Sequence, residues 1–251
     1  HGITADCAIL CEPTNNRVCI ANMGAIWAKI TVAGTVSHAA NSRHPSVVNA
    51  IREMHALQDD IEKWISAYEA AHVCLGEHPN VTIAAVRGGL PWRLARNPFE
   101  CSLYLDIRTV PGQTAEQVKR SLREVLRQFA RTRDKPEPRL EFFVTDPPTE
   151  VAKDALLPRA LSEAHRRLTG QDSPYIIRRT GADSTHLNRY DVECIAYGPG
   201  GRTHPEAKGL MHAVGEHANV ENLVTAARVY LDAALSLCGQ SAAKSAAPIA
   251  M

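Results

Sequence analysis

The chain has 251 residues, of which 45% are apolar and 22% are charged. This composition excludes a disordered chain, a collagen-like repeat and a mini-protein, and it allows one large domain or two smaller ones. Its 28 lysines and arginines oppose 27 acidic residues, which leaves a net charge of +1. Such a charge creates no field that would gather a nucleic acid or an acidic membrane. We therefore expect a globular chain with neither kind of partner.

Three further features bear on the location and the ends of the chain. No stretch reaches the ~18 apolar residues of a membrane span, and the N-terminus lacks a secretory signal pattern. The seven cysteines are scattered, mostly inside apolar runs, which predicts buried free thiols in a reducing, cytoplasmic compartment. The chain begins at His1 and soon enters a strand-like run over 7–11, as the interior of a longer protein would. Residues 239–251 are expected to form a flexible tail.

The middle of the chain, residues 23–147, alternates between the periodicities of strands and helices. Apolar residues at every second position predict a strand over 26–32. Apolar residues three, four and seven positions apart then predict an amphipathic helix from Pro45 to Tyr68.

The second half of this segment repeats the pattern. Short apolar runs predict strands over 81–86 and 101–110, and a third strand over 140–144. Between the last two, Thr114 and Gln117 form a capping box that opens a helix with one apolar face. The order β-α-β-β-α-β predicts a ferredoxin-like domain.

Helices alternate with short strands after residue 148, which is typical of an α/β layer. The predicted elements are a helix over 155–168, a strand over 175–177, a turn over 180–184, a strand over 192–197 and a helix over 221–237. The expected fold is therefore an α/β layer interrupted by a ferredoxin-like insert. The expected domains are 1–22 and 148–238 for the layer, 23–147 for the insert and 239–251 for the tail.

Four groups of residues could carry chemistry. Glu12, Pro13 and Thr14 follow an apolar strand, where α/β sheets place ligand-binding residues, although a loop glutamate is usually just solvated. His38 follows the first strand of the insert and could stabilise an oxyanion or lie exposed in a loop.

The other two groups lie further along the chain. Asp106 and Arg108 interrupt an apolar strand, either as an internal ion pair or with the arginine holding a substrate carboxylate. A Gly-Pro-Gly-Gly turn at 198–201 precedes His204, His212, Glu216 and His217. These imidazole and carboxylate donors suit Zn²⁺, and one alternative is a one-metal site of His204, His212 and Glu216.

In this order and spacing, the motifs resemble those of the cocatalytic zinc amidohydrolases of the aminoacylase, acetylornithine deacetylase, succinyl-diaminopimelate desuccinylase and carboxypeptidase G type. The resemblance covers essentially the whole chain. The matching residues are Glu12-Pro13-Thr14, Gly24 to Gly34, Ser37-His38-Ala39, Asn49-Ala50-Ile51, Asn80 to Gly89, Asp106-Ile107-Arg108-Thr109, Pro111-Gly112, Gly181-Ala182-Asp183, Gly198-Pro199-Gly200 and His212 with Glu216.

The resemblance implies a role for each of these positions. Glu12 and His212 would each bind one of two zinc ions, which cobalt or manganese could replace. The insert would be a lid through which such enzymes form homodimers. His38 would enter the partner subunit's active site and stabilise the oxyanion of the scissile carbonyl. Substrate contacts would come from Arg108, Asn97, Gly181, Asp183 and Gly200.

The implied activity is hydrolysis of an amide bond in an N-acyl amino acid or a small peptide by metal-activated water. The resemblance also places further zinc ligands and the general base ahead of the position of Glu12, where this chain offers no match. We therefore expect a hydrolytic parent protein and an isolated chain that does not assemble the two-metal centre. The alternative is a ferredoxin-like dimerisation or binding module without catalysis of its own.

Overall fold

The computed structural model describes residues 5–200 and 215–245. The chain divides into two compact units. Residues Met23–Pro148 form one, here called the insert unit, and the residues up to Asn22 together with those from Thr149 onward form the other, here called the outer unit. Among the described residues, no helix is both long and apolar enough to cross a membrane.

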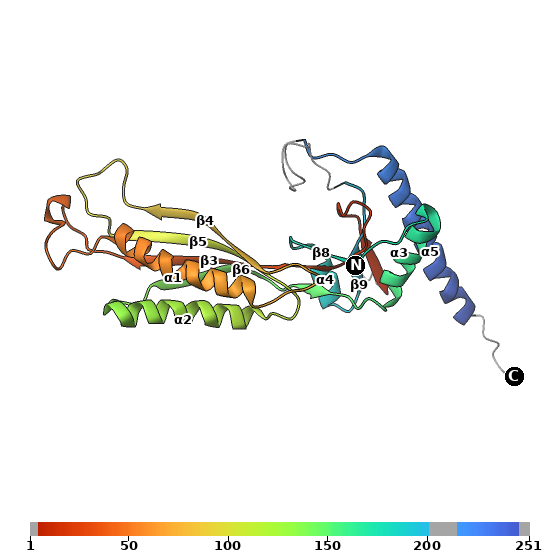
Figure 1. The fold of residues 1–251 in the computed structure, drawn as a ribbon, viewed down its shortest axis with the longest axis horizontal. Helices are drawn as coiled ribbons and strands as arrows, with labels where there is room; N and C mark the ends of the chain where they lie inside the picture. Colours follow the sequence, from red (N-terminus) through yellow and green to blue (C-terminus); the bar gives the residue numbers. More distant parts are fainter. Residues whose placement is uncertain (1–4, 201–214, 246–251) are drawn as a thin grey trace. The chain divides into compact units, whose positions relative to one another are not determined.

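The insert unit is an antiparallel sheet with two helices (Figure 1). In chain order its elements are β3 (Gly24–Ala33), η1 (Ala39–Asn41), α1 (Ala50–Ala70), β4 (Asn80–Gly88), β5 (Glu100–Thr109), α2 (Ala115–Arg133) and β6 (Arg139–Asp146). The strand order β4-β5-β3-β6 places β5 between β3 and β4, the two strands that α1 connects. This split βαβ arrangement confirms the predicted ferredoxin-like fold.

Both helices cover the same face of this sheet (Figure 1). Alternate residues of β3 and β5 point toward them, because side chains of a strand alternate between its two faces. The stripes of the helices complete a single buried core. Its fully buried members include Ile26, Ile30, Leu57, Ile61, Leu103, Leu105, Ile107, Leu122 and Leu126.

The two helix starts differ in how well the sequence predicted them. The structure begins α1 at Ala50, so the predicted start at Pro45 was wrong. The Asn49 side chain accepts hydrogen bonds from the backbone N–H groups of Ile51 and Arg52, and this cap sets the boundary. The capping box of Thr114 and Gln117 at α2 is present as predicted.

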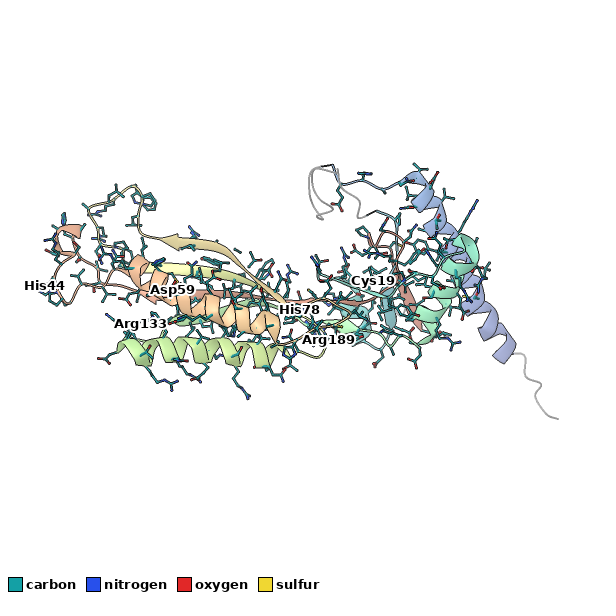
Figure 2. The ribbon with its side chains drawn as sticks, in the orientation of Figure 1. Cys19, His44, Asp59, His78, Arg133 and Arg189 are labelled. Atoms are coloured by element: carbon teal, nitrogen blue, oxygen red, sulfur yellow. The ribbon has the colours of Figure 1, made fainter. Side chains whose placement is uncertain are left out.

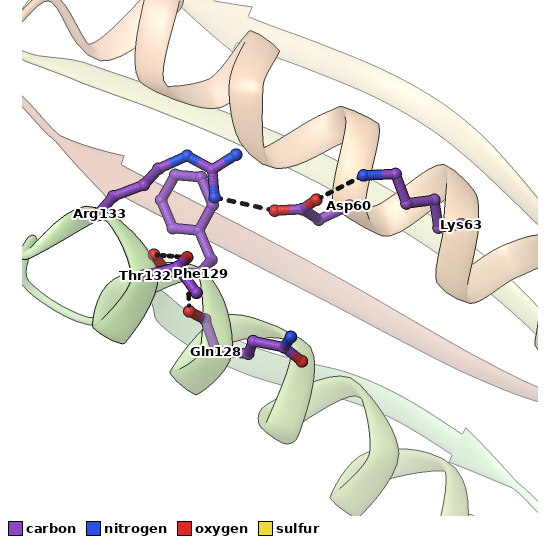
Figure 3. A network of polar contacts seen from close by, with 6 residues as sticks. All are labelled: Asp60, Lys63, Gln128, Phe129, Thr132 and Arg133. Atoms are coloured by element: carbon purple, nitrogen blue, oxygen red, sulfur yellow. Dashed lines mark hydrogen bonds and ion pairs between the residues drawn. The ribbon is translucent and has the colours of Figure 1, made fainter.

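A polar network ties α1 to α2 on their outer side (Figure 3). The Asp60 carboxylate lies 3.0 Å from Arg133 Nη1 and 3.0 Å from Lys63 Nζ. The Arg133 guanidinium also lies 4.3 Å from the centroid of the Phe129 ring, a cation–π contact. Burial would raise the pKa of Asp60, but hydrogen bonds and charges from Lys63 and Arg133 hold it below its ordinary value.

The outer unit contains a second sheet with strand order β1-β9-β2-β7 and with β8 beside β2. Its elements are β1 (Cys7–Leu10), β2 (Cys19–Asn22), β7 (Thr149–Glu150), α3 (Leu156–Thr169), β8 (Ile176–Arg178), α4 (Ser184–Arg189), β9 (Glu193–Ala196) and α5 (Val220–Ser245). The short elements β2, β7 and α4 were not predicted from the sequence. The backbone of α5 is helical to Ser245, past residue 239, where we place the start of the tail.

A buried polar chain connects α3, β9 and α5 within the outer unit. Tyr197, which follows β9, is fully buried, and its hydroxyl lies 2.7 Å from Nδ1 of the buried His165 in α3. The Tyr230 hydroxyl of α5 donates a 2.5 Å hydrogen bond to the carbonyl oxygen of Tyr197. Burial lowers the pKa of His165, because a charged imidazolium is poorly solvated there.

The core of the insert unit gives a first prediction. Phe129 is 2% exposed, whereas Phe143 on β6 is 57% exposed. Phe129→Ala should lower the free energy of unfolding by about 3–5 kcal/mol, because it leaves a cavity between α2 and the sheet. Phe143→Ala is the matched control and should cost less than about 1 kcal/mol. Urea unfolding measures both, and equal losses would contradict this assignment of the core.

The pH dependence of stability gives a second prediction. The pKa of His165 is lower in the folded state than in the unfolded chain, where it is ~6.5. Between the two values the unfolded state binds more protons, so stability must fall as the pH drops below ~6.5. Unfolding free energies measured from pH 7.5 down to 5 should therefore fall more steeply for the wild type than for His165→Gln. Parallel curves would show that His165 does not carry this linkage.

Candidate active site

The candidate site lies where two parallel strands of the outer unit end together. β1 and β9 pair in parallel, with Leu10 opposite Ala196. The loops that follow them therefore leave the same edge of the sheet, the edge at which α/β proteins bind ligands. Residues 11–17 form one loop, and residues 197–200 begin the other.

Thr14 joins these two loops directly. The backbone N–H of Gly198 donates to Thr14 Oγ1 at 3.1 Å. In return, the backbone N–H groups of Thr14 and Asn16 donate to the Gly198 carbonyl oxygen at 3.2 and 2.8 Å. Thr14 is only 5% exposed, so the segments are fixed to each other by buried hydrogen bonds.

The close approach of the loops explains why residue 198 is a glycine. A β-carbon at this position would lie 2.6 Å from the carbonyl oxygen of Glu12, a distance that non-bonded atoms do not tolerate. Gly200 has φ +91°, a conformation that favours glycine, and a β-carbon there would lie 3.4 Å from Cβ of Pro13. The Gly-Pro-Gly turn thus packs closely against the loop that contains Glu12 and Pro13.

Glu12, the predicted carboxylate ligand, forms an ion pair in this arrangement. Its Oε2 atom lies 2.6 Å from Nη1 of Arg178, the last residue of β8. The Glu12 side chain is 31% exposed and that of Arg178 is 10% exposed. Arg178 is not among the residues predicted from the sequence, although a charged residue directly after the apolar pair Ile176-Ile177 was a usable signal.

The structure describes only part of the predicted metal-ligand set. His212 lies outside the described residues, as does His204. Glu216 and His217 are described and exposed, and His217 Nδ1 lies 2.8 Å from the Gly215 carbonyl oxygen. Among the described residues, no three His, Cys, Asp or Glu side chains are grouped so that they could hold a metal ion. Of the two residues predicted to bind a zinc pair, Glu12 and His212, Glu12 is thus the one whose surroundings the structure shows.

The predicted pocket-wall residues occupy two places in the outer unit. Gly200 is buried against the Glu12 loop, as described above. Gly181 and Asp183 are exposed and precede α4, for which Asp183 is the residue before the first turn. The next residue, Ser184, donates a 2.7 Å hydrogen bond to the buried Asn22 side chain, which anchors the start of α4 to β2.

His38 lies at one end of the insert unit, where β3 ends and β5 begins. Its side chain is exposed, and Nδ1 accepts a 3.1 Å hydrogen bond from the backbone N–H of Ala40. The backbone of His38 forms an isolated bridge with Arg96. His44, labelled in Figure 2, lies in the same loop and is also exposed.

Asn97 braces the loops around His38. It is 2% exposed, and its side-chain amide donates to the carbonyl oxygens of Thr35 and Val48 at 2.8 and 2.9 Å. Its backbone N–H donates to the Ser37 carbonyl oxygen at 2.9 Å. Asn97 therefore holds the loop that presents His38, and its predicted contact with substrate stays a prediction.

Arg108 is paired within its own strand. Its Nη2 atom lies 2.8 Å from Asp106 Oδ2, and both side chains are about three-quarters buried, at 23% and 27% exposed. The internal ion pair considered from the sequence is therefore present. To hold a substrate carboxylate as predicted, the Arg108 guanidinium would have to bind Asp106 and the substrate at the same time, or release Asp106.

Comparison with known proteins shows what the chain is similar to. Residues 20–134 match the family model of the peptidase dimerisation domain. An acetylornithine deacetylase of Myxococcus xanthus is 25% identical over 236 residues, which cover 92% of this chain and 58% of that enzyme. The chain thus spans little more than half the length of this relative.

Two solved structures share the fold. A tripeptidase from Staphylococcus aureus superimposes with a TM-score of 0.69 and 17% identity, covering 92% of this chain and 57% of the tripeptidase. An amidase of the hydantoinase/carbamoylase family from Burkholderia multivorans gives a TM-score of 0.63 and 20% identity, covering 87% of this chain and 49% of the amidase. The α/β fold with its inserted ferredoxin-like unit is therefore shared with these enzymes.

The motif order, the matched domain and the shared fold agree with one another. Residues 20–134 therefore match a peptidase dimerisation domain, and the chain is similar along most of its length to an acetylornithine deacetylase.

Proposed function

We propose that this chain is part of a zinc-dependent amidohydrolase that cleaves an N-acyl amino acid or a small peptide. The observation that carries the proposal is the joining of the Glu12 loop to the Gly198 loop at the carboxyl ends of β1 and β9. Deacetylase and peptidase relatives support the hydrolytic class.

Glu12 and His212 would each hold one zinc ion, and cobalt or manganese would suit the same donors. Glu12 fits this role because it lies near the start of a loop that buried hydrogen bonds of Thr14 brace, and because its carboxylate is partly exposed. When bound, a zinc pair supplies a water of lowered pKa as the nucleophile. Two donors cannot hold two ions, so the proposal requires further ligands beyond Glu12 and His212.

The remaining side chains act on the substrate. His38 would donate a hydrogen bond to the oxygen of the scissile carbonyl in the partner's site, where negative charge develops. Arg108 would bind the carboxylate of the amino acid, since guanidinium and carboxylate pair through two hydrogen bonds. The exposed position of His38 on a braced loop supports its role. The match to a dimerisation domain supports a homodimer formed through the insert unit.

The metal ligands give one test of the proposal. His212→Ala in the complete protein should remove one zinc ion per subunit and abolish turnover of N-acetyl amino acids. His204→Ala is the matched control and should change both quantities far less. Zinc content by mass spectrometry and an amine-release assay give the result. If His204→Ala lost as much zinc as His212→Ala, the one-metal alternative would replace the two-metal proposal.

The insert unit gives a separate test. His38→Ala should lower kcat by about 100- to 1000-fold, the usual loss on removing an oxyanion donor. Zinc content and thermal stability should stay unchanged, and His44→Ala, in the same loop, should have wild-type kinetics.

Because His38 is proposed to act on the partner subunit, dimers mixed from His38→Ala and His212→Ala protein should regain activity. Each such dimer has one complete site. Two inactive variants that stay inactive after mixing would contradict action across the dimer.

A further inference from the structure

Two large apolar side chains are exposed on the loop that connects β4 to β5. Trp92 is 80% exposed and Leu94 is 82% exposed, whereas Trp27 on β3 is 41% exposed. Contact of such side chains with water is unfavourable, and tryptophan is among the residues that most often anchor protein interfaces. Because single exposed apolar residues are common, the surroundings of this pair decide its meaning.

The backbone of the loop holds both side chains in a defined arrangement. The N–H of Arg93 donates to the carbonyl oxygen of Leu90 at 2.9 Å, and the N–H of Arg96 donates to the carbonyl oxygen of Arg93 at 3.1 Å. These bonds close two successive β-turns, with Trp92 in the first and Leu94 in the second. A loop that is ordered in this way loses little conformational entropy when a partner covers its side chains.

The same loop is joined to the loop that carries His38. The backbone N–H of Ala39 donates to the carbonyl oxygen of Ala95 at 2.7 Å, next to the bridge between His38 and Arg96. Both loops lie at the end of the sheet where β4 ends and β5 begins (Figure 1). Any partner surface that receives His38 therefore also meets Trp92.

The two loops, residues 34–48 and 89–98, are here called the tip. The tip contains three arginines and no acidic residue. An N-acyl amino acid carries a carboxylate, so the charge of the tip suits a site that holds this substrate. Residues 20–134, which include the tip, match a peptidase dimerisation domain. Both observations favour a second copy of this chain as the partner of the tip.

We propose that Trp92 and Leu94 are positioning residues that dock the tip on the outer unit of a second copy of the chain. This docking seats His38 beside the substrate of that copy. The inference rests on the proposed function and adds the apolar contacts that hold His38 in place. Neither side chain touches the reacting atoms, so their loss misplaces His38 without removing it.

Kinetics of the complete protein tests the positioning role. Trp92→Ala should lower kcat by about 10- to 100-fold with little change in KM, the loss expected when a reacting group is misplaced by about 1 Å. Trp92→Phe keeps an aromatic anchor and should retain most of kcat. Val73, in the connection that enters β4, is 60% exposed, and Val73→Ala is the matched control with wild-type kinetics. Wild-type kcat in both Trp92→Ala and Leu94→Ala would overturn the inference.

Mixed dimers test the subunit on which Trp92 acts. The reference is the dimer of His38→Ala and His212→Ala protein, in which the His212→Ala chain supplies the intact tip. Adding Trp92→Ala to the His212→Ala chain should remove most of the activity that mixing restores. Adding it to the His38→Ala chain should leave that activity unchanged. The reverse pattern, equal losses or no loss in either mixture would contradict docking on the partner.

Fluorescence quenching tests the docking without turnover, so it separates this inference from the proposed function. The part of the tryptophan emission that Trp92→Phe removes reports on Trp92. In the complete protein, acrylamide should quench this part strongly in dilute monomer and weakly in concentrated dimer. Strong quenching at every protein concentration would overturn the docking. Protection of Trp92 in the dimer together with an inactive reference mixture would keep the docking and refute the action of His38 across the dimer.

Discussion

The parallel pairing of β1 with β9 is the constraint on which the candidate site depends. It brings Thr14 and Gly198, which are 184 residues apart in sequence, into hydrogen-bond contact. Closing such a long loop has an entropic cost that grows only slowly with its length. A complete folded unit can therefore lie between the two halves of this sheet. The hydrogen bonds of Thr14 and the absence of a side chain at Gly198 then set the distance between the loops.

In the insert unit, the exposed side chain of His38 lies on loops that are attached to a rigid, well-packed support. The sheet and its two helices bury a continuous apolar core. The loops around His38 have no such core and are held instead by buried hydrogen bonds from Asn97. Because the brace uses backbone carbonyl oxygens, it fixes the loop without occupying the imidazole. His38 is left exposed in a defined backbone conformation.

The Glu12 site in the outer unit is distinguished by an ion pair with the largely buried Arg178. A carboxylate at the end of a strand is common, whereas a guanidinium buried beside it is costly unless the two remain paired. Glu12 and Arg178 therefore constrain each other. Any cation that binds Glu12 changes the balance of charge at Arg178.

The sequence by itself determined the periodic elements and the motif order. Alternating apolar residues and the Thr114 capping box predicted the ferredoxin-like order, because strand and helix periodicities are local properties. Asn49 shows the limit of that approach, since a side-chain cap overruled the proline signal at residue 45. Only the tertiary structure decided that Asn97 faces carbonyl oxygens and that Arg178 reaches Glu12. These contacts join residues whose separation in sequence carries no periodic signal, so they exist only once the sheets have formed.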